Sequence, residues 1–310
     1  MGDQLPLWSV LLLPAVLGGM AFAVAAADAG VAAVAAGRRL TGADLVSPAR
    51  ESLRLLLTQR RVTVAADAPL WRLGAGGLVV VALLVGLVIP LGDRPVLDLP
   101  AGIVWFNAME VLLWVLVWMA GWGANSAYSL VGGYRYLAQG LAYELPLMLA
   151  LITAGLGAGS LRVADVVAAQ QDRWFVVEMP VAFAVYLAGV LGFSFYGPLA
   201  APVAADLSGG ARVELSGVDR LVFAAGRYLA LTVGAAFAVP LFLGGSAGLV
   251  LPGPVWTLVK TAAVLAGLIW VRWRLPLVRP DRYVEIAWVV LVPLILAQTL
   301  VTSLVVLAER

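Results

Sequence analysis

The chain has 310 residues, of which 63% are hydrophobic and only 12% are charged. Soluble domains are roughly 45–50% apolar and about 25% charged, so this composition excludes a soluble globular protein and a disordered one. The absence of cysteine and histidine excludes disulfides, cysteine-ligated metal sites and catalysis by either residue, and a net charge of +2 gives no reason to expect a nucleic-acid partner. The composition therefore predicts a polytopic membrane protein.

Apolar segments long enough to cross a bilayer follow one another along the whole chain. A transmembrane helix needs about 20 mostly apolar residues. Windows of this kind predict eight spans, at 7–36, 69–90, 101–121, 131–156, 176–197, 219–244, 255–273 and 284–307. We therefore expect an all-α protein in which residues 1–310 form a single integral membrane domain, and we expect small-residue runs such as 23–36 to permit close helix contact.

The first connection contains a candidate surface helix at residues 48–60. Its two faces are Leu53, Leu56 and Leu57 on one side, and Arg50, Arg54 and Arg61 on or near the other. A short amphipathic helix on the cytoplasmic surface is the structure this pattern predicts. It fits an anchor in the lipid interface, which the sequence favours, or a docking surface for a soluble partner.

The arginines indicate which side of the membrane each connection occupies. Seven of them lie between the first and second spans, and four lie around the last connection, at 272–282. The alternate loops contain only Arg94, Arg162 and Arg173. By the positive-inside rule, the first and last connections are cytoplasmic and both termini face outward. The longest polar stretch late in the chain, 198–218, is then an irregular cytoplasmic loop.

Charged side chains inside predicted spans are candidates for function, because each is unfavourable in hydrocarbon. Asp28, Glu110 and Glu144 lie within the first, third and fourth spans, and Arg135 precedes Glu144 by nine residues. Glu144 shares a polar stripe with Tyr136, Gln139 and Tyr143, which is typical of an internal water path or proton relay. A structural ion pair with an arginine is the alternative for these carboxylates, and it is more credible for Arg227 than for Glu144.

Two long motifs resemble a known family. The first is GWGANSAYSLVGGYRYLAQGLAYELP at 121–146, and the second is WVRWRLPLVRPDRYVEIAWVVLVPL at 270–294. A weaker match is VELSG at 213–217. The two long motifs occur in the order expected for the H-subunit (subunit 1) family of respiratory complex I, the proton-pumping NADH–quinone oxidoreductase, and the chain resembles that family. The resemblance covers nearly the whole chain.

The resemblance implies a subunit that joins the hydrophilic redox arm to the membrane arm, encloses most of a quinone chamber and contributes to proton translocation. Quinone is then the substrate, and no cofactor is bound covalently to this chain. NADH, flavin and iron–sulfur clusters would belong to partner subunits of a complex in a bacterial-type cell membrane. Quinone would enter from the bilayer among the first span, the sixth span and the surface helix.

The resemblance also suggests roles for particular residues. The proton-path candidates are Glu144, Arg135 and Asp28, and the candidates near quinone are Glu214 and Asp206. The candidates for the partner interface are Arg38, Arg39, Arg54, Arg279 and Asp281. No residue is assigned to a metal.

Departures from the family pattern leave other functions open. The family carries an acidic stretch after the fifth span, whereas no charged residue occurs here between Glu178 and Asp206. A family glutamate in the sixth span aligns with Arg227. The chain could therefore be a non-catalytic assembly subunit, or the membrane anchor of a related hydrogenase-type complex. A stand-alone secondary transporter is disfavoured, since the sequence has no evident pair of interrupted helices.

Overall fold

The computed structural model describes residues 11–92, 94–248 and 251–308, and in this part of the chain every regular element is helical. The first half comprises α1 (Leu12–Ala35), α2 (Gly42–Leu45), α3 (Ser47–Leu57), α4 (Ala68–Gly86), α5 (Gly102–Gly123) and α6 (Ala127–Ala158). The second half comprises α7 (Val163–Ala168), α8 (Phe175–Glu178), α9 (Pro180–Phe193), α10 (Gly217–Phe242), α11 (Gly253–Arg274), α12 (Pro280–Ile286) and α13 (Val292–Ala308). A π-helical segment, Ala287–Leu291, joins α12 to α13.

Seven helices in the described residues are long and apolar enough to cross a membrane, which confirms the predicted fold class. The predicted fifth span is different, because α9 is an apolar helix of only 14 residues. The backbone leaves the helical region at Met179, directly before Pro180, and this break separates α8 from α9. Residues 7–10, at the start of the predicted first span, lie outside the described residues.

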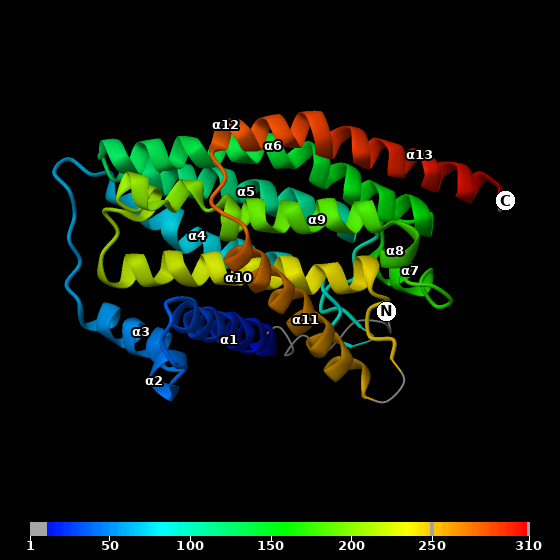
Figure 1. Ribbon diagram of the computed structural model, residues 1–310, viewed down its shortest axis with the longest axis horizontal. Coiled ribbons are helices and arrows are strands. Elements are labelled where there is room, and N and C mark those ends of the chain that lie inside the picture. The colour runs from blue at the N-terminus through cyan, green and yellow to red at the C-terminus, as the bar shows by residue number, and fades with distance from the viewer. Residues whose placement is uncertain (1–10, 93, 249–250, 309–310) are drawn as a thin grey trace.

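The long helices run roughly side by side, and α11 crosses α10 obliquely (Figure 1). Helix α10 is the centre of the bundle, since it contacts α1, α3, α4, α9 and α11. Glycine allows the closest approaches: a Cβ built at Gly74 of α4 would lie 2.4 Å from the backbone nitrogen of Ala120 in α5. Helices α4 and α5 therefore pack backbone to backbone, as small residues permit in membranes.

The loop predicted at 198–218 is irregular but compact. It contains four single 3₁₀ turns, namely Gly197–Leu199, Ala201–Val203, Ala205–Leu207 and Gly210–Arg212. A Cβ at Gly132 of α6 would lie 2.1 Å from the backbone nitrogen of Ala211, so the loop rests directly on the backbone of α6. Most of this loop is therefore part of the packed structure rather than a free surface segment.

The predicted surface helix is α3. Its leucine stripe faces away from the protein, since Leu53, Leu56 and Leu57 are 62%, 54% and 87% exposed, and Leu55 is the leucine that packs inward. An outward leucine stripe fits the interpretation of α3 as an interfacial anchor. In Figure 1, α2 and α3 lie at one end of the bundle, and α13 ends at the opposite one.

At the end of the bundle opposite α3, the buried side chains of Lys260 and Gln170 form hydrogen bonds with backbone groups. The Lys260 amine donates hydrogen bonds to the carbonyl oxygens of Leu243, Gly245 and Ala247 at 2.7, 2.9 and 2.7 Å, and it lies 4.3 Å from the centre of the Trp174 ring. Gln170 donates to the carbonyl oxygens of Pro240 and Leu241 and accepts from the amides of Phe175 and Gly244. These bonds satisfy backbone groups around the end of α10.

Candidate functional site

A cavity of about 710 Å³ lies between α1, α3 and α10. Its α1 wall includes five small residues spaced three or four apart, namely Gly18, Ala21, Ala25, Ala29 and Ala32. Small side chains on one helical face leave room beside the helix. Within the run 23–36, Ala25, Ala29 and Ala32 line the cavity, whereas Gly30 and Ala33 are buried against neighbouring segments.

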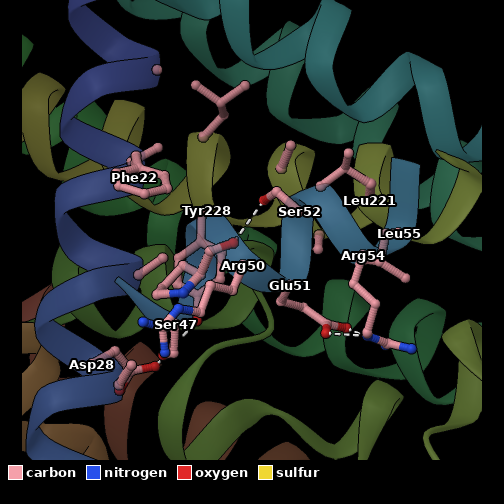
Figure 2. Close-up of a pocket in the computed structure, with 18 of the residues that line it drawn as sticks. Phe22, Asp28, Ser47, Arg50, Glu51, Ser52, Arg54, Leu55, Leu221 and Tyr228 are labelled. Atoms are coloured by element: carbon pink, nitrogen blue, oxygen red, sulfur yellow. Dashed lines mark hydrogen bonds and ion pairs between the residues drawn. The ribbon is translucent and has the colours of Figure 1, made fainter. Parts of the chain in front are cut away.

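The wall of this cavity is apolar in one part and charged in another. Phe22, Leu221 and Leu229 give it an apolar surface, whereas α3 contributes Arg50, Glu51, Ser52 and Arg54 to the opposite wall (Figure 2). Within α3, the Arg54 guanidinium donates to both carboxylate oxygens of Glu51 at 2.6 Å, and this bond lowers the pKa of Glu51. The cavity is thus an apolar space with a charged rim.

Asp28 lies at the inner end of this cavity in a fully compensated ion pair. Arg272 of α11 pairs with one of its oxygens, and the Tyr228 hydroxyl of α10 donates to the same oxygen at 3.2 Å. The Trp273 indole donates to the other oxygen at 3.1 Å. Asp28 is 4% exposed, so a negative charge buried in α1 joins three helices.

A second buried carboxylate cluster connects α5 and α6. The Tyr143 hydroxyl donates to Oε1 of Glu110 at 2.6 Å and accepts a hydrogen bond from the Trp114 indole at 2.9 Å. Glu144 accepts a hydrogen bond from the Asn107 amide at 2.8 Å, and the buried Oε2 atoms of Glu110 and Glu144 have no hydrogen-bond partner among the described residues. Glu110 is 1% exposed, and neither glutamate forms an ion pair with a cation among the described residues.

Sequence reasoning noted Glu110 as a buried carboxylate but did not choose it as a site residue, and it missed Asn107 and Trp114. Their spacing was the available signal, because positions 107, 110 and 114 are three and four residues apart and share one face of a helix. The tight contact with α6 depends on Gly140, where a Cβ would lie 2.6 Å from the Trp114 ring.

The expected polar stripe on α6 divides into two parts. Tyr136 donates to the carbonyl oxygen of Phe193 at 2.6 Å, and Gln139 donates to that of Gly192 at 2.7 Å. Both side chains therefore satisfy the carbonyl groups at the end of α9, which is a structural role. Only Tyr143 of this stripe reaches the carboxylate cluster.

Arg135 does not pair with Glu144. Its guanidinium pairs with Asp206 of the 3₁₀ loop at 2.8 Å and lies 3.5 Å from the carbonyl oxygen of Ala201. Glu214 accepts a hydrogen bond from Ser126 at 2.7 Å, so it holds the loop to the start of α6. Neither Asp206 nor Glu214 lines the cavity between α1, α3 and α10.

The residues expected at a partner interface are exposed at the α3 end of the bundle. Arg38 pairs with Asp44 at 3.1 Å, and Arg279 pairs with Asp281 at 3.2 Å, while Arg39 is exposed. Arg54 pairs with Glu51 as described above. Asp44 also accepts hydrogen bonds from the hydroxyl and the amide of Thr41, and these bonds lower the pKa of Asp44. The described residues contain no group of three or more carboxylates that could hold a metal ion.

Comparison with known proteins supports the sequence motifs. A family described as NADH dehydrogenase matches residues 9–303. The H subunit of NADH-quinone oxidoreductase from Geobacillus kaustophilus is 36% identical over 267 residues, covering 84% of this chain and 80% of the relative. The second H subunit of Geobacter sulfurreducens is 36% identical over 270 residues, covering 84% and 82%. The second H subunit of Cereibacter sphaeroides is 38% identical over 258 residues, covering 82% and 80%.

Proposed function

Because the chain belongs to the NADH dehydrogenase family of complex I H subunits, we propose that it is the membrane subunit of a complex I-type NADH–quinone oxidoreductase. In this proposal it admits quinone from the bilayer and relays protons, while partner subunits carry the flavin and the iron–sulfur clusters. The observation that supports it most directly is the apolar cavity between α1, α3 and α10, which has a charged rim.

The shape and chemistry of this cavity suit a quinone. An isoprenoid tail is apolar and fits against the small residues of α1 and against Leu221 and Leu229 of α10. The quinone head carries two carbonyl acceptors, which need donors when they leave water. Arg272 offers further N–H donors at the inner end of the cavity, where its pair with Asp28 holds it in place, whereas the single hydroxyl proton of Tyr228 is already donated to Asp28.

The cluster of Glu110, Tyr143 and Glu144 is the proposed proton relay. Two interacting carboxyl groups with no cation beside them can hold a proton between them, and Tyr143 adds a hydroxyl that both donates and accepts. A cavity of about 10 Å³ adjoins Glu110 on the side of α4 and α10. This volume is at the lower limit for one water molecule, so the route would continue in that direction.

The cavity can be tested by filling it. Ala25→Leu adds volume on the lining face of α1, whereas Ala27→Leu adds the same volume on the exposed face of that helix. In the assembled complex, we expect Ala25→Leu to raise the KM for quinone about tenfold or more and Ala27→Leu to leave it unchanged. Equal kinetics for the two variants would contradict quinone entry at this cavity.

The relay can be tested with Glu144→Gln, which keeps the shape and the hydrogen bond from Asn107 but cannot transfer a proton. We expect an assembled complex in which quinone turnover with coupled proton uptake falls by about 100-fold, in the range typical of losing a proton-transfer group. Native gels check assembly, and reconstituted vesicles check proton uptake. Wild-type proton pumping in this variant would show that Glu144 is not in the path. If the complex assembles but has no quinone turnover with either the wild-type or the variant chain, that result would favour the assembly-subunit alternative.

Orientation is the remaining part of the proposal. The segments 48–60, 198–218 and 272–283 would face the cytoplasm, and both termini would face outward, in accordance with the positive-inside rule. The sequence has no cysteine, so Arg279→Cys provides a unique labelling site. Labelling of this position by an impermeant thiol reagent from the outer face of intact cells would show that the orientation is inverted.

A further inference from the structure

A second cavity, of about 240 Å³, adjoins the first at the α3 end of α10. Its lining includes no carboxylate but includes four arginines, namely Arg212, Arg220, Arg227 and Arg272. The arginines come from the last 3₁₀ turn of the loop, from α10 and from α11. Chain segments distant in sequence thus bring four guanidinium groups around one small space.

The positive charge of this cavity is compensated only in part. Arg272 pairs with Asp28. Arg227 donates to the carbonyl oxygen of Phe195 at 2.8 Å and stacks on the Phe195 and Tyr196 rings, but it meets no carboxylate. Arg212 and Arg220 form no ion pair among the described residues.

Arg212, Arg227 and Arg272 are half-buried and Arg220 is exposed, and partial burial of the first three charges is unfavourable without a counter-ion. Burial and the neighbouring positive charge of Arg220 both lower the pKa of Arg212, so the surroundings of Arg212 disfavour its charge. Arg220 acts electrostatically on Glu51 of α3, and Glu51 is already bonded to Arg54. An anion inside the cavity would relieve this repulsion directly.

We propose that this arginine cavity binds a phosphate group, supplied by a lipid headgroup or by free phosphate. Guanidinium groups bind phosphate oxygens through paired, charge-assisted hydrogen bonds, and a phosphate has enough oxygens to meet several arginines at once, whereas a single carboxylate has two. The cavity shares Ala224, Tyr228 and Arg272 with the lipid-side cavity, so a headgroup can reach it from the bilayer. This inference does not depend on the proposed quinone or proton roles.

The test uses the full chain, purified in phosphate-free buffer and an uncharged detergent, and measures its melting temperature. A ligand that binds the folded state alone raises the melting temperature with a saturable dependence on concentration. The three probes are inorganic phosphate, phosphatidylglycerol, and diacylglycerol with the same acyl chains but no phosphate. We expect saturable stabilisation by one or both phosphate compounds and none by diacylglycerol.

The matched variants replace arginines that make no ion pair, so the fold should survive the change. Arg212→Gln with Arg220→Gln removes two guanidinium groups from the cavity, whereas Arg72→Gln removes one that is exposed at the start of α4. We expect the double variant to raise the half-saturating phosphate concentration about tenfold or more, and Arg72→Gln to leave it unchanged. Circular dichroism confirms that each variant is folded.

The outcomes separate the sources. Stabilisation by phosphatidylglycerol alone identifies a lipid headgroup, and stabilisation by inorganic phosphate as well identifies a site for free phosphate; both support the proposal. The proposal would be overturned if chloride at equal ionic strength raised the melting temperature as much as phosphate does. It would also be overturned if the double variant responded to phosphate as the wild type does. Tighter binding of a polyglutamate peptide through Arg212 and Arg220 would also overturn it, in favour of an acidic segment of a partner protein.

Discussion

The two buried carboxylate sites of this protein differ in how their charge is balanced. Asp28 has a cationic partner in Arg272 and two further donors, so it is a fixed charge that ties α1 to α10 and α11. Glu110 and Glu144 have only neutral donors and each other. A compensated charge stabilises a structure, whereas a carboxyl pair without a cation is suited to holding and passing a proton. Burial alone, therefore, does not identify a proton-path residue.

Removal of the Asp28 carboxylate is expected to have the largest effect on stability. Asp28→Ala leaves Arg272 partly buried without its counter-ion, and loss of one partner of a buried pair is destabilising by about 3–5 kcal/mol. Titration with a denaturing detergent measures this loss, and Asp28→Ala combined with Arg272→Ala should restore part of it. The control Glu285→Ala breaks an exposed pair with Arg282 and should change little. A small effect of Asp28→Ala would mean that Asp28 is not the fixed charge described here.

Tyr143→Phe tests the neutral site. It removes the donor to Glu110, and a buried acceptor left without its partner lowers stability by about 1–3 kcal/mol. The same denaturation measurement applies, and Tyr134→Phe is the matched control, because Tyr134 is 50% exposed on the same helix. Equal stability of the two variants would contradict a structural contribution from the Tyr143–Glu110 hydrogen bond.

Arg135→Gln should have a smaller effect, because Arg135 and its partner Asp206 are partly exposed, with side chains 26% and 56% accessible. Pairs of this kind contribute about 0–1 kcal/mol. Since Arg135 does not pair with Glu144, we expect proton uptake of the assembled complex to remain close to wild type. A loss comparable to that of Glu144→Gln would place Arg135 in the relay after all.

The smallest effect is expected at Asp44, whose lowered pKa arises first from the Thr41 hydroxyl and then from the Thr41 amide. A lowered pKa in the folded state gives a stabilisation that is present above the ordinary value of 3.8 and is lost as pH falls through the folded value. The protection of residues 42–46 against hydrogen exchange, expressed relative to the intrinsic exchange rate at each pH, should therefore fall on acidification below pH 4 in the wild type. In Asp44→Asn that pH dependence should disappear.

Composition and hydropathy were sufficient to predict the fold class, because each span carries its own local signal. The fifth span was misjudged in length, since the break at Met179 and Pro180 lies inside an apolar run that hydropathy treats as continuous. The predicted place of quinone entry, among the first span, the sixth span and the surface helix, coincides with the cavity of about 710 Å³. Its occupation by quinone stays a prediction.

Side-chain pairing was less accessible from the sequence. Helical spacing placed Gln139 and Tyr136 on the face of Glu144, but it carried no information about the carbonyl groups at the end of α9 that they bind. Likewise, Arg135 lies nine residues before Glu144, yet its partner is Asp206, which a loop brings from 71 residues away. Contacts between distant segments decide these roles, and one sequence does not encode them locally.

The environment of Lys260 has a practical consequence for chemical modification. It is the only lysine in the sequence, and its amine uses three hydrogen bonds to carbonyl oxygens while lying against Trp174. An acylating reagent needs room to approach the amine, and Lys260, which is 7% exposed, offers little of it in the folded protein. Acylation of Lys260 would therefore follow the opening of the α10–α11 connection, so this residue can serve as a built-in reporter of local unfolding.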